Sequence, residues 1–169
     1  MIRLVTLLFA LISIAAQARI DENLAECETR YGPVVEHRPA TQKDSDKEAC
    51  VFSKNGITIV AEFHQGKVWR ISYNKTGMEA DEVEILLNAN AVDGAWSPPL
   101  KISGQEVRTS SDHKRVAIFT PGKRPEATFT LVIATRACTD ANRADYETKL
   151  AAIPATLQRR NEGKGLKDF

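Results

Sequence analysis

Three cysteines are the side chains of this 169-residue chain best suited to covalent chemistry: Cys27, Cys50 and Cys138. They allow three disulfide pairings, and any single bridge leaves an odd thiol. A helix and the strand that soon follows it often lie side by side, which favours a bridge between Cys27 and Cys50 worth about 3 kcal/mol. A catalytic thiol is the alternative. Because the chain has no Cys-x-x-Cys, we expect the cysteines to be structural.

No other group of residues has the spacing of a known catalytic or metal site. His37, His64 and His113 occur in loop-like or turn-like sequence, and the chain contains no zinc, nucleophile-elbow, phosphate-loop or dinucleotide motif. We therefore predict no catalytic residue, no metal site and no cofactor. Carboxylates that only the fold brings together, such as Glu62 and Asp112, are the basis of the alternative function, a hydrolase of cell-wall or polysaccharide material.

The candidate binding residues are one tryptophan and two basic pairs. Trp96 precedes Ser-Pro-Pro on a stiff, irregular stretch, where an exposed indole would anchor a partner and a buried one would fill the core between two halves of the chain. Lys114 with Arg115, and Lys123 with Arg124, fall at expected hairpin tips and could meet an acidic partner.

The N-terminus has the pattern of a secretory signal peptide over residues 1–18. Arg3 precedes an apolar run from Leu4 to Ala16, and a small-x-small exit ends at Ala18. The run is shorter than the roughly 20 residues that a membrane-spanning helix needs. We therefore predict export to the periplasm or the medium, with a mature chain that starts at Arg19 and has no transmembrane segment.

Charge gives no reason to expect a nucleic-acid partner. Without Arg3 the chain has 22 basic and 22 acidic residues. The acidic excess lies before residue 91 and the basic excess after it, which is consistent with two halves that attract each other.

Helix and strand patterns alternate along the mature chain. We predict a helix over 22–31 capped by Asp21, a loop over 36–48, a helix from a Thr76 capping box to about Asn90, and a helix over 139–153. Period-two alternation predicts strands over 50–53, 57–63, 67–73, 105–109, 115–120 and 127–135.

The hairpin around Gly66 has two possible registers. A two-residue loop would divide the apolar residues between the two faces, whereas a three-residue loop pairs Phe63 with Lys67 and places Trp69 and Ile71 on the face of Phe63. We predict the three-residue loop, with Gly66 in the left-handed conformation and Trp69 in the core.

This order of elements predicts an α+β fold with an antiparallel meander sheet and helices packed on one face. We expect one domain over 19–155 and a flexible tail over 156–169. The helix-then-strands order also suggests a duplicated unit, with repeats over 21–75 and 76–135.

Several stretches in residues 22–92 resemble known exported proteins: Leu24 to Pro33, Asn55 to Ile59 and Gly66 to Tyr73. They look like small exported bacterial proteins of uncharacterised function. They are also similar to the small lipoprotein subunit of the outer-membrane β-barrel assembly machine and to β-lactamase-inhibitor-like modules. The resemblance implies a periplasmic or secreted module that binds a protein or wall component, and it carries over no catalytic residues. We therefore expect an exported, cofactor-free binding module rather than an enzyme, and its partner to be an envelope or extracellular protein.

Overall fold

The structure is a computed structural model that describes residues 19–40, 48–91, 95–122 and 127–151. It has three helices and eight strands, in the order α1 (Leu24–Tyr31), β1 (Glu36–Arg38), β2 (Glu48–Lys54), β3 (Ile57–His64), β4 (Lys67–Thr76), α2 (Ala80–Asn88), β5 (Leu100–Ile102), β6 (Gln105–Thr109), β7 (Arg115–Thr120), β8 (Thr128–Thr135) and α3 (Arg136–Ala151). The signal peptide, the basic pair Lys123 and Arg124, and the C-terminal tail predicted from the sequence lie outside the described residues.

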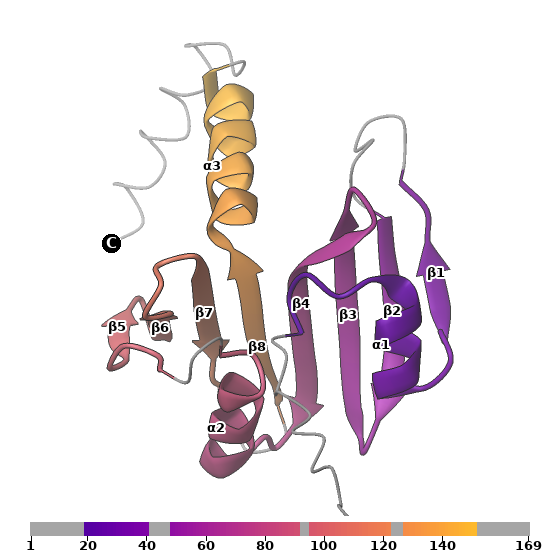
Figure 1. Ribbon diagram of the computed structural model, residues 1–169. Coiled ribbons are helices and arrows are strands. Elements are labelled where there is room, and N and C mark those ends of the chain that lie inside the picture. The colour runs from indigo at the N-terminus through magenta and orange to yellow at the C-terminus, as the bar shows by residue number, and fades with distance from the viewer. Residues whose placement is uncertain (1–18, 41–47, 92–94, 123–126, 152–169) are drawn as a thin grey trace, which may run out of the picture.

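All eight strands form one antiparallel sheet in the order β1-β2-β3-β4-β8-β7-β6-β5. The chain thus runs twice through a helix followed by four strands, and the last strand of each run meets the other at the centre of the sheet (Figure 1). The prediction of a mixed α+β fold with an antiparallel sheet is confirmed.

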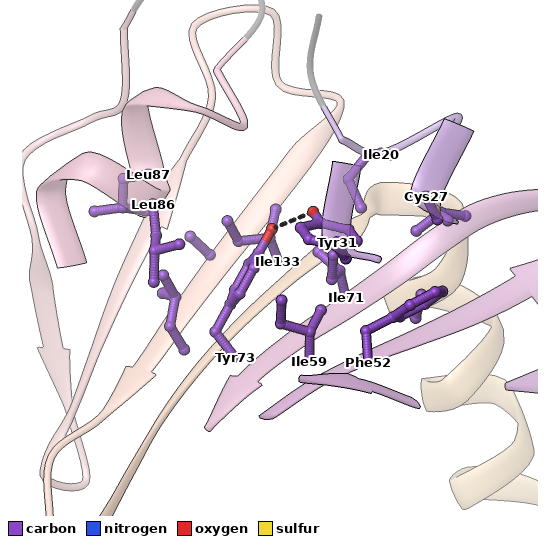
Figure 2. Close-up of a cluster of buried hydrophobic side chains, with 14 of the residues drawn as sticks. Ile20, Cys27, Tyr31, Phe52, Ile59, Ile71, Tyr73, Leu86, Leu87 and Ile133 are labelled. Atoms are coloured by element: carbon purple, nitrogen blue, oxygen red, sulfur yellow. Dashed lines mark hydrogen bonds between the residues drawn. The ribbon is translucent and has the colours of Figure 1, made fainter. Parts of the chain in front are cut away.

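The core is built from two rows of side chains that cross the sheet. One row pairs Phe52, Ile59, Tyr73 and Leu131 on adjacent strands, and the next pairs Cys50, Ala61, Ile71 and Ile133. These residues are at most 3% exposed. The same cluster contains Cys27 and Tyr31 from α1, and Val83, Leu86 and Leu87 from α2 (Figure 2). In contrast, α3 begins directly after β8 and extends beyond its end (Figure 1).

The register predicted for the β3–β4 hairpin is wrong. His64 pairs with Lys67 and Phe63 with Val68, so the turn has only two residues, Gln65 and Gly66, both with positive φ. A bulge at Trp69 then shifts the pairing by one residue, so that Glu62 pairs with Arg70. The bulge is what keeps the apolar residues on one face despite the short turn.

Val68 therefore takes the core position that the sequence predicts for Trp69. Val68 is fully buried, whereas Trp69 is half-buried and stacks on His64 with ring centroids 4.7 Å apart. The left-handed conformation predicted for Gly66 is confirmed, with φ at +74°.

Both N-terminal caps differ from the predicted ones. Asn23 caps α1, since its Oδ1 accepts from the Glu26 N–H at 3.0 Å while Glu26 accepts from the Asn23 N–H at 2.7 Å. Asp21 instead adopts a left-handed conformation and donates its N–H to Val68 O. Glu79 precedes α2, and Thr76 ends β4.

The sequence prediction missed the two outermost strands. Each has three residues, and all six are exposed, so neither shows the alternation that indicates a strand. Within the described residues, no helix combines the length and the apolar character needed to cross a membrane.

Candidate functional site

Trp96 is partly buried and packs beside α2. Its indole N–H donates to Leu87 O at 2.8 Å, and its ring packs against the core cluster.

The predicted basic binding surface is not assembled in the part of the chain that the structure describes. Arg115 is only 7% exposed and lies 3.4 Å from Asp21, so it links β7 to the segment before α1. Lys114 is exposed in the β6–β7 turn, where its backbone N–H donates to Asp112. Lys123 and Arg124 are outside the described residues.

Cys27 and Cys50 are buried thiols, and the predicted bridge between them is not formed in the structure. The Cys27 thiol instead donates to Glu22 Oε2 at 3.9 Å. Burial, and then the charge of Glu22, raise the pKa of Cys27 to about 12, so this thiol is neutral at physiological pH. Cys138 is also buried, at the start of α3.

The two carboxylates considered for hydrolysis have separate structural partners. Glu62 accepts from Arg70 on the neighbouring strand at 2.5 Å. Asp112 accepts from the Ser110 hydroxyl and from the Lys114 N–H within its own turn. Neither residue lines a pocket described here.

The structure reveals a different candidate site, a pocket of about 200 Å³ between α1 and α2 over the sheet. Figure 2 shows Tyr73 of β4 between Tyr31 on one side and Leu86 on the other. The lining combines cations and phenols with aliphatic side chains: Arg19, Arg30, Tyr31, Lys54, Asn55, Ile57, Ile59, Tyr73, Ile85 and Leu86.

Arg19 reaches this pocket because the chain just before α1 is fixed to the sheet. The Asp21 N–H donates to Val68 O, and Glu22 O accepts from the Val68 N–H, both at 2.8 Å. The next residue toward Arg19, Ile20, is only 1% exposed, so its side chain is also fixed in the core. These contacts hold the residue before them, Arg19, against the aromatic rings of the core.

The Arg19 guanidinium lies over two tyrosine rings, 5.6 Å from the Tyr31 centroid and 5.8 Å from the Tyr73 centroid. This is cation–π distance. Nη1 of Arg19 donates to the Tyr73 hydroxyl at 3.3 Å, and the Tyr31 hydroxyl is a second neutral partner. The Nε of Arg19 is buried without an acceptor, and no described carboxylate pairs with it. The pocket therefore holds a cation whose charge nothing in the described chain neutralises.

The other two cations of the lining are held by the protein. Arg30 donates from Nε to the buried carboxylate of Glu22 at 2.8 Å and forms a second bond to it from Nη2. The Lys54 ammonium donates to the backbone carbonyl of Arg30. A carbonyl leaves the positive charge of Lys54 in place, so the net potential at this end of α1 is positive.

The tyrosine pair adds a hydrogen-bond donor. The Tyr73 hydroxyl accepts from Arg19 and from Asn90 Nδ2 at 3.1 Å, which occupies both of its acceptor positions. Its own proton must then point to Tyr31 Oη, 3.2 Å away, and the Tyr31 proton remains available. Burial raises the pKa of Tyr31, so this phenol stays protonated. Arg19 and Tyr31 thus both offer donors to a bound group.

A second, wider hollow of about 470 Å³ lies on the outer side of α1 and is lined by Glu22, Asn23, Ala25, Glu26, Thr29 and Arg30. Its charged groups already serve the helix, because Glu22 pairs with Arg30 and Glu26 completes the cap with Asn23. It offers no unpaired charge comparable with Arg19.

Comparison with known proteins gives no family. No protein-family model matches the chain, and no curated protein matches it. A cysteine-rich secretory protein from Staphylococcus aureus is structurally similar at 9% sequence identity with a TM-score of 0.43. The alignment covers 71% of this chain, but the chain spans only 46% of that protein.

Proposed function

We propose that the protein is an exported binding module that captures an anionic group with an apolar neighbour in the pocket between α1 and α2. The observation that carries the proposal is Arg19, a partly buried guanidinium whose partners among the described residues are two neutral tyrosines. Desolvating a charge without an opposite charge is costly, and a bound anion would remove that cost.

The lining narrows the class of ligand. Arg19 and Tyr31 provide donors for a carboxylate, while Ile57, Ile59 and Leu86 provide an aliphatic wall. No carboxylate contributes to this part of the lining. A volume of about 200 Å³ suits one carboxylate and a short aliphatic group rather than a whole cofactor. We therefore propose that the ligand is the C-terminal carboxylate and last apolar side chain of an envelope or extracellular protein, a known mode of peptide capture.

Cleavage of the signal peptide after Ala18 would strengthen the site. Arg19 would then become the first residue and would carry an α-ammonium group beside its guanidinium. Two positive charges on one residue of the lining would raise the potential that an incoming carboxylate meets.

We also propose that the two runs of a helix and four strands are duplicated units whose helices cover the same face of the sheet. The mirrored strand order and the shared core cluster support this arrangement. The pocket takes Arg30 and Tyr31 from α1 and Ile85 and Leu86 from α2, so its lining requires both units.

Binding of matched peptides tests the proposal. Two hexapeptides that end in leucine, one with a free carboxylate and one amidated, differ only in the charge that Arg19 would recognise. We expect calorimetry to detect the free acid and a loss of about 10-fold or more for the amide, the usual value of a charged hydrogen bond. A free fatty acid would present the same combination of a carboxylate and an aliphatic chain, so hexanoate is tested alongside the peptides. Tighter binding of hexanoate than of the peptide would indicate that the ligand is a fatty acid and not a protein C-terminus.

The variant Arg19→Gln should lose about 10- to 100-fold in affinity for the free acid. Lys101→Gln, an exposed cation on β5 outside the pocket, is the matched control and should leave the affinity unchanged. Equal binding of the acid and the amide, or equal losses in the two variants, would refute the site.

A further inference from the structure

The sheet edge opposite β5 brings together one histidine, one carboxylate and one thiol. His37 of β1 is the direct cross-strand partner of Cys50 of β2, and Glu48 lies two residues before Cys50 on the same face. The His37 Nε2 atom is 2.7 Å from Glu48 Oε1. One potential ligand atom from each of the three residues lies within 4.8 Å of the other two.

We propose that His37, Glu48 and Cys50 bind a zinc ion, with water as the fourth ligand. Zinc–ligand bonds of about 2.0–2.3 Å place neighbouring ligand atoms about 3.3–3.6 Å apart in a tetrahedron. The observed spacing needs only that the imidazole and the carboxylate separate slightly and that the more distant ligand atoms approach by about 1 Å, which side-chain rotation can provide.

The donor set selects the metal. Thiolate, imidazole and carboxylate together suit zinc, whereas calcium and magnesium prefer oxygen ligands alone. The two anionic ligands would also match the charge of a dication.

The burial of the three side chains is graded, as access by an ion from solvent requires. Cys50 is fully buried, whereas the His37 and Glu48 side chains are 51% and 45% exposed. Because β1 has only three residues paired with β2, an ion bound to both strands would hold this short edge strand in place. We therefore infer that the ion would stabilise the pairing of β1 with β2.

Metal titration of the reduced protein, produced without a histidine tag, tests the site. Cobalt is the spectroscopic probe, and we expect a tetrahedral visible spectrum together with a near-ultraviolet thiolate-to-cobalt band, both displaced by one equivalent of zinc. Zinc at 100 times its dissociation constant should raise the Tm by about 5–10 °C.

His37→Asn and Glu48→Gln alter exposed side chains, so both variants should fold. Each should weaken zinc binding by more than about 10-fold, and Cys50→Ser should abolish the thiolate band. Two variants are the matched controls. His113→Asn changes a histidine at a left-handed turn position that asparagine tolerates, and Glu36→Gln changes an exposed carboxylate of β1, the strand that carries His37. Both should bind zinc as the parent does.

Two results would overturn the proposal. One is zinc binding weaker than about 10 μM in the parent protein, which would leave the cluster without a metal at ordinary concentrations. The other is binding that the His37 and Glu48 variants do not weaken, or a cobalt spectrum without the thiolate band, since either would place the ion elsewhere. Failure of the peptide experiment above has no bearing on this test, because the two sites share no residue.

Discussion

The hydroxyl of Tyr73 is the centre of the buried polar network beside the candidate pocket, so removing it is the most informative single change. Tyr73 is fully buried, and its oxygen contacts Arg19, Tyr31 and Asn90 at 3.1–3.3 Å. Tyr73→Phe keeps the ring and its packing in the core and deletes only the oxygen. Any loss of stability can therefore be assigned to the hydrogen bonds.

The expected cost follows from what each partner keeps. Asn90 retains its bond to Leu86 O at 2.7 Å, whereas Tyr31 and Arg19 each lose their bond to the Tyr73 hydroxyl. One or two net hydrogen bonds near the core correspond to about 1–2 kcal/mol in the free energy of unfolding. For a chain of this size that is a fall of about 2–8 °C in Tm.

Urea denaturation of Tyr73→Phe, Tyr31→Phe and the double variant measures the network directly. Tyr31→Phe should cost less than Tyr73→Phe, because it removes fewer contacts. The two costs should not add, since both single variants break the same Tyr31–Tyr73 bond, and we expect a coupling of about 0.5–1 kcal/mol. A Tyr73→Phe protein within about 0.3 kcal/mol of the parent, or strictly additive variants, would show that the hydroxyls are not bonded as described.

Two further predictions concern the hairpin turn and the thiol below α1. Gly66→Ala should lower the free energy of unfolding by about 1 kcal/mol or more, because φ is +74° there; an unchanged Tm would contradict the two-residue turn. Cys27, with a pKa of about 12, should have about one thiolate in 10⁴ at pH 8 and resist iodoacetamide in the folded protein, so rapid labelling of this residue would contradict its burial. The unfolded thiol ionises near pH 8.5, so this residue's contribution makes folding less favourable as the pH rises from about 8.5 to 12.

The sequence predicts the long strands well because each carries a clear alternation. The predicted strand over 57–63 corresponds to β3, and those over 115–120 and 127–135 correspond to β7 and β8. β1 and β5 escape prediction because three exposed residues carry no period. As a result, the proposed zinc ligands could not be brought together from sequence, since His37 meets Cys50 only through the pairing of β1 with β2.

The hairpin error has a specific cause. Both candidate registers assumed an unbroken ladder, in which shifting the loop by one residue moves every apolar side chain of β4 to the other face. The bulge at Trp69 allows the short turn and the single apolar face to coexist. In the sequence of β4 the only trace of the bulge is that two apolar residues, Val68 and Trp69, are adjacent. Either of them could occupy a core position, so the sequence does not show which one does.

The pocket shows why the binding residues chosen from sequence differ from those that the structure brings together. Large aromatics and basic turn residues were selected because they stand out locally, yet Trp96 and Arg115 are tied to the interior. A signal for the tyrosine pair of the proposed site does exist in the sequence: Tyr31 and Tyr73 each occur on an otherwise apolar face, one on a helix and one on a strand. A buried phenol needs a polar partner, so two of them predicted for one core already imply a polar site inside it.

What the sequence does not contain is the position of Arg19. It precedes the first helix, follows the predicted cleavage site, and belongs to no periodic pattern. Its place over the two rings depends on the backbone bonds between residues 21–22 and Val68, which connect segments more than 45 residues apart. The charge of the pocket therefore depends on tertiary structure. It arises when the segment before α1 is hydrogen-bonded to β4, a pairing that the helix pattern does not predict.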